Sequence, residues 1–400
     1  MSVLIIGDVG ALEGMFHIGD EAMFEVAVVE LAQRGRDAIG VSSHPAETAA
    51  RYGIPAVPRL GFEGLGRVEA ARRAEHLLAV AAGTARLEPE DPARETIAAL
   101  DAAEALVNAG GGNLASRWPT HVFERSTLVS MARMRGLPVV VTGQTLGPDL
   151  DAPDDAVVAR MLREAALVGV REPDTAALVA SWGVPATLNV DDASFLGLSE
   201  RDPVRGAGGG VVVSLSGWFA GRPADEVEQR IAMLVDAAAL AVGPVSFHAH
   251  FGPLDPTAPP RGDAAVHERI RTRMSQPSTV VPTGTSREAA DLVRSADLLI
   301  TCRYHPAVFA TPAGTPVLAL SADRYTRIKL RGALGHWGQR SVIDLDDLPD
   351  APRLLADLTA RADEIRGEAA ERLPGLRAAS QQWWDTVCAV IEGSAASAKR

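Results

Sequence analysis

Short apolar runs alternate with helical stretches along almost the whole chain, a pattern typical of α/β proteins. The first run, Ser2–Ile6, is followed by a glycine-containing loop and a helical stretch at residues 24–31. The nearly pure β-branched run at 138–141 predicts a strand buried on both faces, as in a parallel sheet. The alternation restarts with a strand-like run at 211–215. We therefore expect an α/β fold with two Rossmann-like, doubly wound domains facing a central cleft.

The domain boundary is expected near residue 200, because residues 197–210 combine proline, charge and four late glycines in the clearest linker of the chain. We predict an N-terminal Rossmann-like domain over 1–200, on the acceptor side, and a C-terminal one over 201–375, on the donor side. Helices are expected at 353–371 and 378–392. The terminal helix, within 376–400, is predicted to cross back to the N-terminal domain, with packing on the second domain as the alternative.

Composition limits the classes of protein to which this chain can belong. The net charge of −12 argues against a nucleic-acid partner, although a local basic pocket remains compatible with it. Only two cysteines occur in 400 residues, so no disulfide framework is indicated. No apolar run is long enough to span a bilayer, and the first residues are typical of a strand rather than a signal peptide. A cytoplasmic enzyme is the expectation.

The strongest candidate chemistry follows the apolar run at 298–300, where Thr301-Cys302-Arg303-Tyr304-His305 places a fixed cation and a titratable imidazole at a strand's carboxyl end. Ligands of open α/β sheets bind at that edge. The alternatives are an internal ion pair for Arg303 and a structural imidazole for His305. Lys329 lies after the following strand as a further cation. Cys302 is interpreted as a small core residue, since no base adjoins it.

The first half offers polar groups at comparable strand ends. Three glycines and an amide follow one strand, and Thr142 opens a second small, polar stretch. Glycines there would allow positive φ and close approach of a ligand, with a plain tight turn as the alternative. Arg171 ends another strand and could clamp a carboxylate or phosphate, unless it forms a surface ion pair with Glu172 or Asp174. The candidate ligand-lining residues are Gly111, Gly112, Asn113, Gly143 and Gln144.

Two further groups of polar residues have open interpretations. Asp20 stands where the first helix should be N-capped; with Gly19 and Glu21 it either binds sugar hydroxyls or caps the helix. His248 and His250 are spaced to face the same way on a strand, and the alternatives for them are metal binding, substrate contact and structural hydrogen bonding. Metal binding has the least support, because no further ligand with suitable spacing lies nearby, and no metal is expected.

The absence of three common motifs argues against several enzyme classes. The dinucleotide pattern G-x-G-x-x-G is absent after the first strand, and neither G-x-x-x-x-G-K-[ST] nor G-x-S-x-G occurs. A nicotinamide dehydrogenase, a P-loop kinase and an α/β-hydrolase are therefore disfavoured. Fixed arginines with one imidazole suit an anionic, phosphorylated donor that requires a proton in its transition state.

An ordered series of motifs resembles the polysaccharide pyruvyltransferase family, from about residue 4 to 335. The motifs are HIGDEAM at 17–23, AGGGNL at 109–114, TGQTLGP at 142–148, VREPDT at 170–175, DDASFL at 191–196, CRYHP at 302–306 and AGTPV at 313–317. The resemblance implies a GT-B-like fold and a transferase of polysaccharide biosynthesis. His17 replaces a common Asn, and Thr145-Leu146 depart from the usual pair, which leaves the acceptor open.

The resemblance also implies roles. Arg303 and His305 match the family's R-x-H pair, as donor-anion ligand and general acid or base; Arg171 matches a second anion clamp, and Lys329 a basic position. Phosphoenolpyruvate would be the donor substrate, with no cofactor, and a saccharide, free or lipid-linked, or a glycosylated metabolite would accept a pyruvate ketal. A homodimer is compatible with the sequence. The rival functions are a nucleotide-sugar glycosyltransferase and a non-catalytic sugar- or anion-binding relative.

Overall fold

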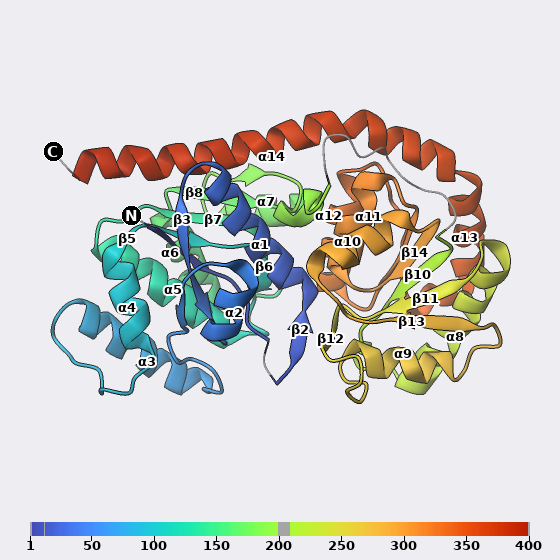
Figure 1. Cartoon of the computed structure of the whole chain (residues 1–400), viewed down its shortest axis with the longest axis horizontal. Helices are drawn as coiled ribbons and strands as arrows, with labels where there is room; N and C mark the ends of the chain where they lie inside the picture. Colours follow the sequence, from blue (N-terminus) through green and yellow to red (C-terminus); the bar gives the residue numbers. More distant parts are fainter. Residues whose placement is uncertain (1, 12, 199–208, 399–400) are drawn as a thin grey trace. The chain divides into compact units, whose positions relative to one another are not determined.

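The computed structural model describes residues 2–11, 13–198 and 209–398 (Figure 1). The chain divides into two compact units. The first comprises Met1–Leu12, Met23–Asp192 and Ala379–Arg400, and the second comprises Glu13–Ala22 and Ala193–Ala378. The divisions fall inside helices α1 (Ile18–Gln33) and α14 (Ala362–Ala398).

Among the described residues, the first unit is built on one eight-stranded parallel sheet in which seven strands follow the order β4-β3-β1-β5-β7-β8-β9 and β6 pairs with β7. If only the seven strands of this path are numbered in chain order, the sheet order begins 3-2-1-4-5-6, which is the Rossmann arrangement. The direction of the order reverses between β1 and β5. The strands are β1 (Ser2–Ile6), β3 (Asp37–Ser42), β4 (Ala56–Pro58), β5 (Ala103–Asn108), β6 (Gly111–Leu114), β7 (Val139–Leu146), β8 (Leu167–Val170) and β9 (Thr187–Leu188). Its other helices are α2 (Pro45–Tyr52), α3 (Arg67–Ala81), α4 (Ala93–Ala102), α5 (Pro119–Met134), α6 (Ala152–Glu164) and α7 (Pro173–Ser181).

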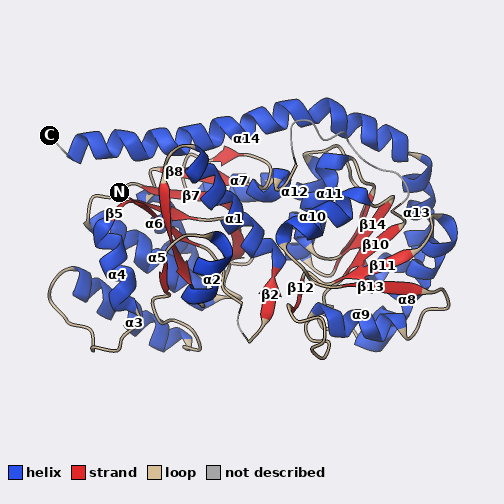
Figure 2. Ribbon diagram, viewed as in Figure 1, coloured by secondary structure: helices blue, strands red, loops and turns tan. Residues whose placement is uncertain are grey.

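The second unit repeats the same topology with six parallel strands in the order β13-β11-β10-β14-β15-β16, which reverses between β10 and β14. Figure 2 shows helices on both sides of these strands. The strands are β10 (Val211–Ser214), β11 (Val245–His248), β13 (Ser278–Val281), β14 (Leu298–Thr301), β15 (Val317–Ser321) and β16 (Val342–Asp344). The helices are α8 (Ala224–Ala241), α9 (Asp263–Arg271), α10 (Ser286–Ser295), α11 (Tyr304–Ala310), α12 (Arg324–Gly335) and α13 (Ala351–Ala360).

A small antiparallel ribbon adds an early segment of the chain to the second unit. Strand β2 (Met15–His17) pairs with β12 (Phe251–Pro253), and Ile18 N donates to His250 O at 3.0 Å. The first turn of α1 therefore lies in the second unit, although it comes early in the chain.

Each unit buries its own apolar core around its sheet. The β-branched run of β7 is buried at Val139, Val140 and Val141, as the sequence predicts for a parallel strand. The α/β class with two Rossmann-like units is confirmed. Most of the predicted linker and the expected boundary at residue 200 lie outside the described residues.

Three local expectations were wrong. Helix α1 begins at Ile18, so Asp20 lies inside the first turn rather than at the N-cap. Strand β7 runs on to Leu146, which places Gly143 and Gln144 within the strand instead of in a loop after it. At Gly110 and Gly111 φ is not positive; a Cβ at Gly110 would stand 2.7 Å from Met23 Sδ, so close packing explains that glycine.

The C-terminal region also differs from the prediction of helices at 353–371 and 378–392. Helix α13 ends at Ala360, and α14 then runs without interruption through Pro374. Buried residues on both sides of Pro374, among them Ala369 and Trp384, hold the two halves by packing, which outweighs the missing backbone donor. None of the helices in the described part of the chain is long and apolar enough to cross a bilayer.

Candidate active site

The Arg303–His305 segment stands at the carboxyl end of β14, where the strand order of the second sheet reverses. Thr301, the last residue of the strand, shapes the turn: its hydroxyl donates to Ser214 O at 2.7 Å and accepts from Arg303 N at 2.9 Å. Arg303 is the N-cap residue of α11, and His305 is in the first turn of that helix. This is the position at which open α/β sheets bind ligands.

Asp263, at the start of α9, holds the guanidinium of Arg303 in a two-pronged ion pair. Arg303 Nε donates to Asp263 Oδ2 at 2.8 Å, and the same carboxylate oxygen accepts from Phe251 N at 2.9 Å. Desolvation would lower the pKa of Arg303, but Asp263 raises it above its ordinary value. With a quarter of its side chain exposed, Arg303 is an oriented, permanent cation that a ligand can reach.

The imidazole of His305 rests directly on Gly19, in the first turn of α1. A Cβ at Gly19 would lie 1.9 Å from His305 Nδ1, which no side chain could tolerate in this arrangement. The His305 ring is also 5.0 Å from that of Tyr304 and 6.0 Å from that of Phe309. Gly19 therefore serves the site by having no side chain, a role more specific than that of a flexible loop glycine.

The acidic pair after Gly19 belongs to the same surroundings. Asp20 Oδ2 lies 2.6 Å from His17 Nδ1, and its charge also contributes to raising the pKa of Arg303. Glu21 is buried in the same helical turn. The predicted residues Gly19, Asp20 and Glu21 are thus grouped with Arg303 and His305 in the second unit.

His248 and His250 form a buried imidazole pair next to this group, with ring centroids 5.1 Å apart. His248 Nε2 lies 3.0 Å from Thr283 O, a structural hydrogen bond. Burial lowers the pKa of both rings, so they are neutral at physiological pH. Within the described part of the chain, no cluster of three potential metal ligands is present.

Two more residues of the second unit were singled out in the sequence. Lys329 Nζ, on α12, lies 3.2 Å from the Tyr325 hydroxyl and 5.0 Å from the Tyr304 ring centre, which brings this cation toward the R-x-H segment. Cys302 Sγ accepts from Ser216 N at 3.0 Å, and burial raises the thiol's pKa. A protonated thiol in that setting is not a nucleophile.

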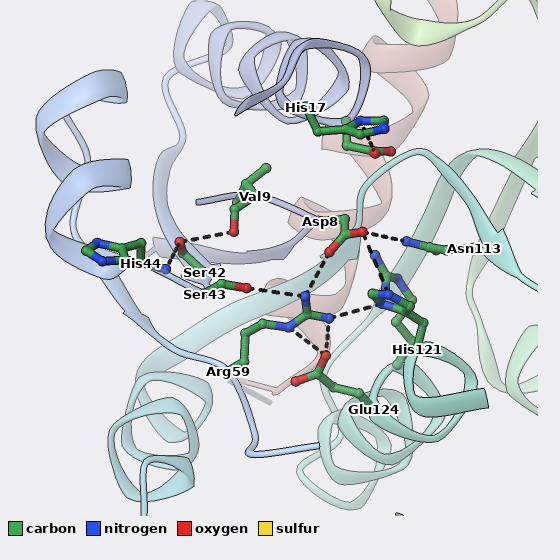
Figure 3. A network of polar contacts seen from close by, with 12 residues as sticks. Asp8, Val9, His17, Ser42, Ser43, His44, Arg59, Asn113, His121 and Glu124 are labelled. Carbon is green, nitrogen blue, oxygen red and sulfur yellow. Dashed lines mark hydrogen bonds and ion pairs between the residues drawn. The ribbon is translucent and has the colours of Figure 1, made fainter. Parts of the chain in front are cut away.

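The first unit has a separate polar network at its own point of strand reversal, between β1 and β5 (Figure 3). Arg59 is its centre: Nη1 donates to Asp8 Oδ1 at 2.8 Å, and Nε donates to Glu124 Oε2 at 2.8 Å. His121 Nδ1 accepts from Arg59 at 3.2 Å and from Arg125 at 3.0 Å, and burial lowers the pKa of His121 to about 4. The ring is therefore neutral, and two carboxylates balance two guanidinium groups.

None of the network residues named above was predicted from the sequence as part of a site. Asp8 directly follows the first strand, and residues 121, 124 and 125 have the spacing of one helical face. Those signals were available, but Arg59 is 65 residues from Glu124, and nothing local connects them.

The remaining predicted residues also belong to the first unit. Gly111, Gly112 and Asn113 lie in β6, which pairs with β7 and sets Gly111 opposite Gln144. Gly143 has a φ of +55°, and a Cβ there would lie 2.4 Å from Asp192 Oδ2. The predicted site residues thus form two groups, each at the carboxyl edge of its own sheet.

Arg171 lies at the end of β8, wholly buried against carboxylates. Its guanidinium is 2.6 Å from Asp191 and 3.1 Å from Glu172, and Nε donates to Thr145 Oγ1 at 2.9 Å. This arrangement favours the ion-pair alternative, although with buried rather than surface partners. The predicted role as an anion clamp stays a prediction.

Replacing Arg171 with alanine is expected to destabilise the protein by about 3–5 kcal/mol, because two buried carboxylates would lose their counter-charge. Urea unfolding measures the loss. Arg135→Ala is the matched control, since its partner Asp101 is 56% exposed and a surface pair contributes about 1 kcal/mol or less. Equal stability of the two variants would contradict a structural role for Arg171, and weaker phosphoenolpyruvate binding by a folded Arg171→Ala protein would support the clamp.

Asp192 is a buried acid with an unusual proton affinity. Desolvation and the neighbouring Asp191 raise its pKa to about 7, while Thr142 Oγ1 donates to Asp192 Oδ2 at 2.8 Å. Thr142 Oγ1 in turn accepts from Trp383 Nε1, on α14, at 3.0 Å. The indole of the terminal helix and the acid are therefore linked through one hydroxyl.

Asp192 should make stability fall as pH rises. Asp192 binds its proton more tightly in the folded protein than in the unfolded chain. The stability that this proton adds to the folded state is therefore complete below the ordinary carboxyl pKa and is lost as pH rises toward about 7. Asp192→Asn, which mimics the protonated acid, is expected to remove this loss, roughly 1.4 kcal/mol for each unit of pKa shift. Unfolding by denaturant at pH 5 and pH 8 tests this; an unchanged pH difference in the variant would contradict it.

Comparisons with known proteins identify the family and the fold of the chain. The sequence matches the family profile of the polysaccharide pyruvyl transferases over residues 17–324. No curated protein matches the sequence significantly.

Similar solved structures include the UDP-GlcNAc 2-epimerase of Neisseria meningitidis bound to UDP-GlcNAc (11% identity, TM-score 0.60, covering 97% of this chain and 100% of that one). A second is the S. aureus MnaA–UDP structure (12%, 0.59, 92% and 91%). A third is a UDP-glucosyltransferase from Polygonum tinctorium in a complex with 3,4-dichloroaniline (13%, 0.57, 98% and 98%). At these identities the likeness shows a GT-B-like fold alone. The family match covers most of the sequence, and the chain belongs to the polysaccharide pyruvyl transferase family of transferases.

Proposed function

We propose that this protein transfers a pyruvyl group from phosphoenolpyruvate to two hydroxyls of a saccharide or glycosylated metabolite, forming a ketal. The observation that carries the proposal is the Arg303 cation, oriented by Asp263 and partly exposed, in the same short segment as His305. A fork of guanidinium donors suits the phosphate or carboxylate of such a donor, and an imidazole suits proton transfer near neutral pH.

The chemistry requires one acid and one base. His305, in its protonated form, gives a proton to the methylene carbon of phosphoenolpyruvate, which becomes a methyl group and leaves an oxocarbenium-like C2. A sugar hydroxyl attacks C2 and returns its proton to His305. A second hydroxyl then replaces phosphate at C2, and its proton leaves with the phosphate.

The positive charges of Arg303 and Lys329 suit a departing phosphate. When the second hydroxyl replaces phosphate, the bond from C2 to the phosphate oxygen breaks with its electron pair on phosphate, so negative charge grows on phosphate in that step. A preoriented cation stabilises such charge without reorganising. Lys329, whose ammonium lies near Tyr304 in the same segment, would supply additional positive charge.

Acceptor-dependent phosphate release from phosphoenolpyruvate tests the proposal, with mass spectrometry to detect the added pyruvate ketal on a panel of saccharides. Phosphate release together with the mass increase supports it. Turnover of nucleotide-sugars, without phosphate release from phosphoenolpyruvate for any acceptor, would replace it with a glycosyltransferase function. Binding of phosphoenolpyruvate with no turnover of either donor would instead indicate a non-catalytic relative.

A further inference from the structure

Two buried amide oxygens face one small space in the first unit, beside Gly111. A Cβ at Gly111 would lie 3.3 Å from Asn113 Oδ1 and 3.6 Å from Gln144 Oε1, so the missing side chain leaves room between them. Both residues are more than nine-tenths buried. Among the described residues, neither oxygen has a hydrogen-bond partner. A buried acceptor without a donor costs free energy, which a ligand that donates would recover.

The orientation of both amides is fixed by their nitrogens. Gln144 Nε2 donates to Ala109 O at 2.5 Å, and Asn113 Nδ2 donates to Asp8 Oδ2 at 3.4 Å. Turning either amide over would set its oxygen against another acceptor, so the oxygens are the atoms that face Gly111.

The network of Figure 3 fixes the position of Asp8, which accepts from the Asn113 amide. Glu124 holds Arg59, Arg59 holds Asp8, and Asp8 accepts from Asn113. Asp8 itself is one-third exposed, which leaves its carboxylate within reach of a ligand at the same edge. The edge also lies where the first sheet reverses its strand order, between β1 and β5.

The chemistry of these atoms selects the ligand. Two amide oxygens and a carboxylate accept hydrogen bonds and repel phosphate and carboxylate groups. The nearby guanidinium groups are already bound to Asp8, Glu124, Asn108 and His121. A neutral ligand rich in hydroxyl donors matches these atoms, and the anionic phosphoenolpyruvate does not.

We propose that Asn113, Gln144 and Asp8 form a subsite for the hydroxyls of a neutral saccharide, and that Gly111 keeps it open. Its identity as the acceptor subsite of the transferase rests on the proposed function; saccharide binding itself does not. All four residues belong to the first unit, and their acceptor oxygens suit a neutral sugar.

Gly111→Ala is the sharpest probe, because its φ lies outside the left-handed region and the atoms nearest its new methyl are the two amide oxygens, at 3.3 and 3.6 Å. The variant should fold normally and lose saccharide binding. Saturation-transfer NMR on the full chain, with a panel of neutral methyl hexopyranosides, measures binding; calorimetry with phosphoenolpyruvate should give wild-type affinity. Gly367→Ala, at an exposed helical position with no neighbouring atom near its Cβ, is the matched control.

Asn113→Ala provides a second variant if Gly111→Ala misfolds. It removes one amide oxygen of the subsite, and Asp8 stays in place because Arg59 still donates to it. Loss of one hydrogen bond should weaken saccharide binding roughly tenfold. If wild-type protein binds none of the glycosides, or if both variants bind them as wild-type does, the subsite is overturned. Where phosphate release from phosphoenolpyruvate is found, the variants should raise the acceptor KM and leave the donor KM unchanged. The proposed function fails separately, when no acceptor promotes phosphate release.

Discussion

Arg303→Ala is expected to lower the kcat/KM for phosphoenolpyruvate by about 10²–10³-fold while the protein remains folded. The guanidinium is the oriented cation at the carboxyl end of β14, and its removal would take away the positive charge proposed to stabilise the departing phosphate. Calorimetry should show weaker donor binding as well, and phosphate release measures the rate. Arg303→Lys should recover only part of the loss, because an ammonium cannot reproduce the fork that Asp263 now orients.

The matched control for this experiment is Arg269→Ala. Arg269, on α9, donates to Glu228 at 2.8 Å, so it is another guanidinium–carboxylate pair of the same unit, away from the R-x-H segment. It should change stability more than activity. If Arg303→Ala kept a wild-type rate, Arg303 would be an internal ion-pair partner of Asp263, the alternative that the sequence left open.

Asp263 shows where sequence reasoning stops. A strand ending in Arg-x-His could be recognised locally, because residues after a parallel strand gather at one edge of the sheet. The carboxylate that orients Arg303 is 40 residues upstream on another helix, and no spacing rule connects the two. Arg59 and Glu124 pose the same difficulty in the first unit. Pairings set by tertiary packing were not predictable, whereas the strand ends that carry the groups were.

Gly19 was predicted as a site residue, and the structure gives it a more specific role than the sequence suggested. The sequence offered it as part of a loop that binds sugar or caps a helix, and its neighbour Asp20 was expected to be the cap. The ribbon of β2 and β12 instead brings the first turn of α1 into the second unit, against His305. An antiparallel pairing between residues 15–17 and 251–253 is a long-range contact, which local periodicity does not encode.

Gly19→Ala is expected to reduce activity nearly as much as His305→Ala, about 10²–10⁴-fold, the usual contribution of a positioned acid or base. The physical reason is geometric: the new methyl would occupy the place of the imidazole, since its three nearest atoms all belong to His305. The imidazole must rotate away, while the helical backbone of α1 accepts alanine readily. Phosphate release gives the rate, and thermal unfolding checks that the protein stays folded.

A double-mutant cycle distinguishes displacement of the imidazole from general damage. If Gly19 acts only by making room for His305, then Gly19→Ala combined with His305→Ala should be no slower than His305→Ala alone. Gly335→Ala, in α12 with no atom near its Cβ, should retain the wild-type rate. Additive losses in the double variant would mean that Gly19 contributes through another contact, and an active Gly19→Ala enzyme would show that His305 does not need its present position for proton transfer.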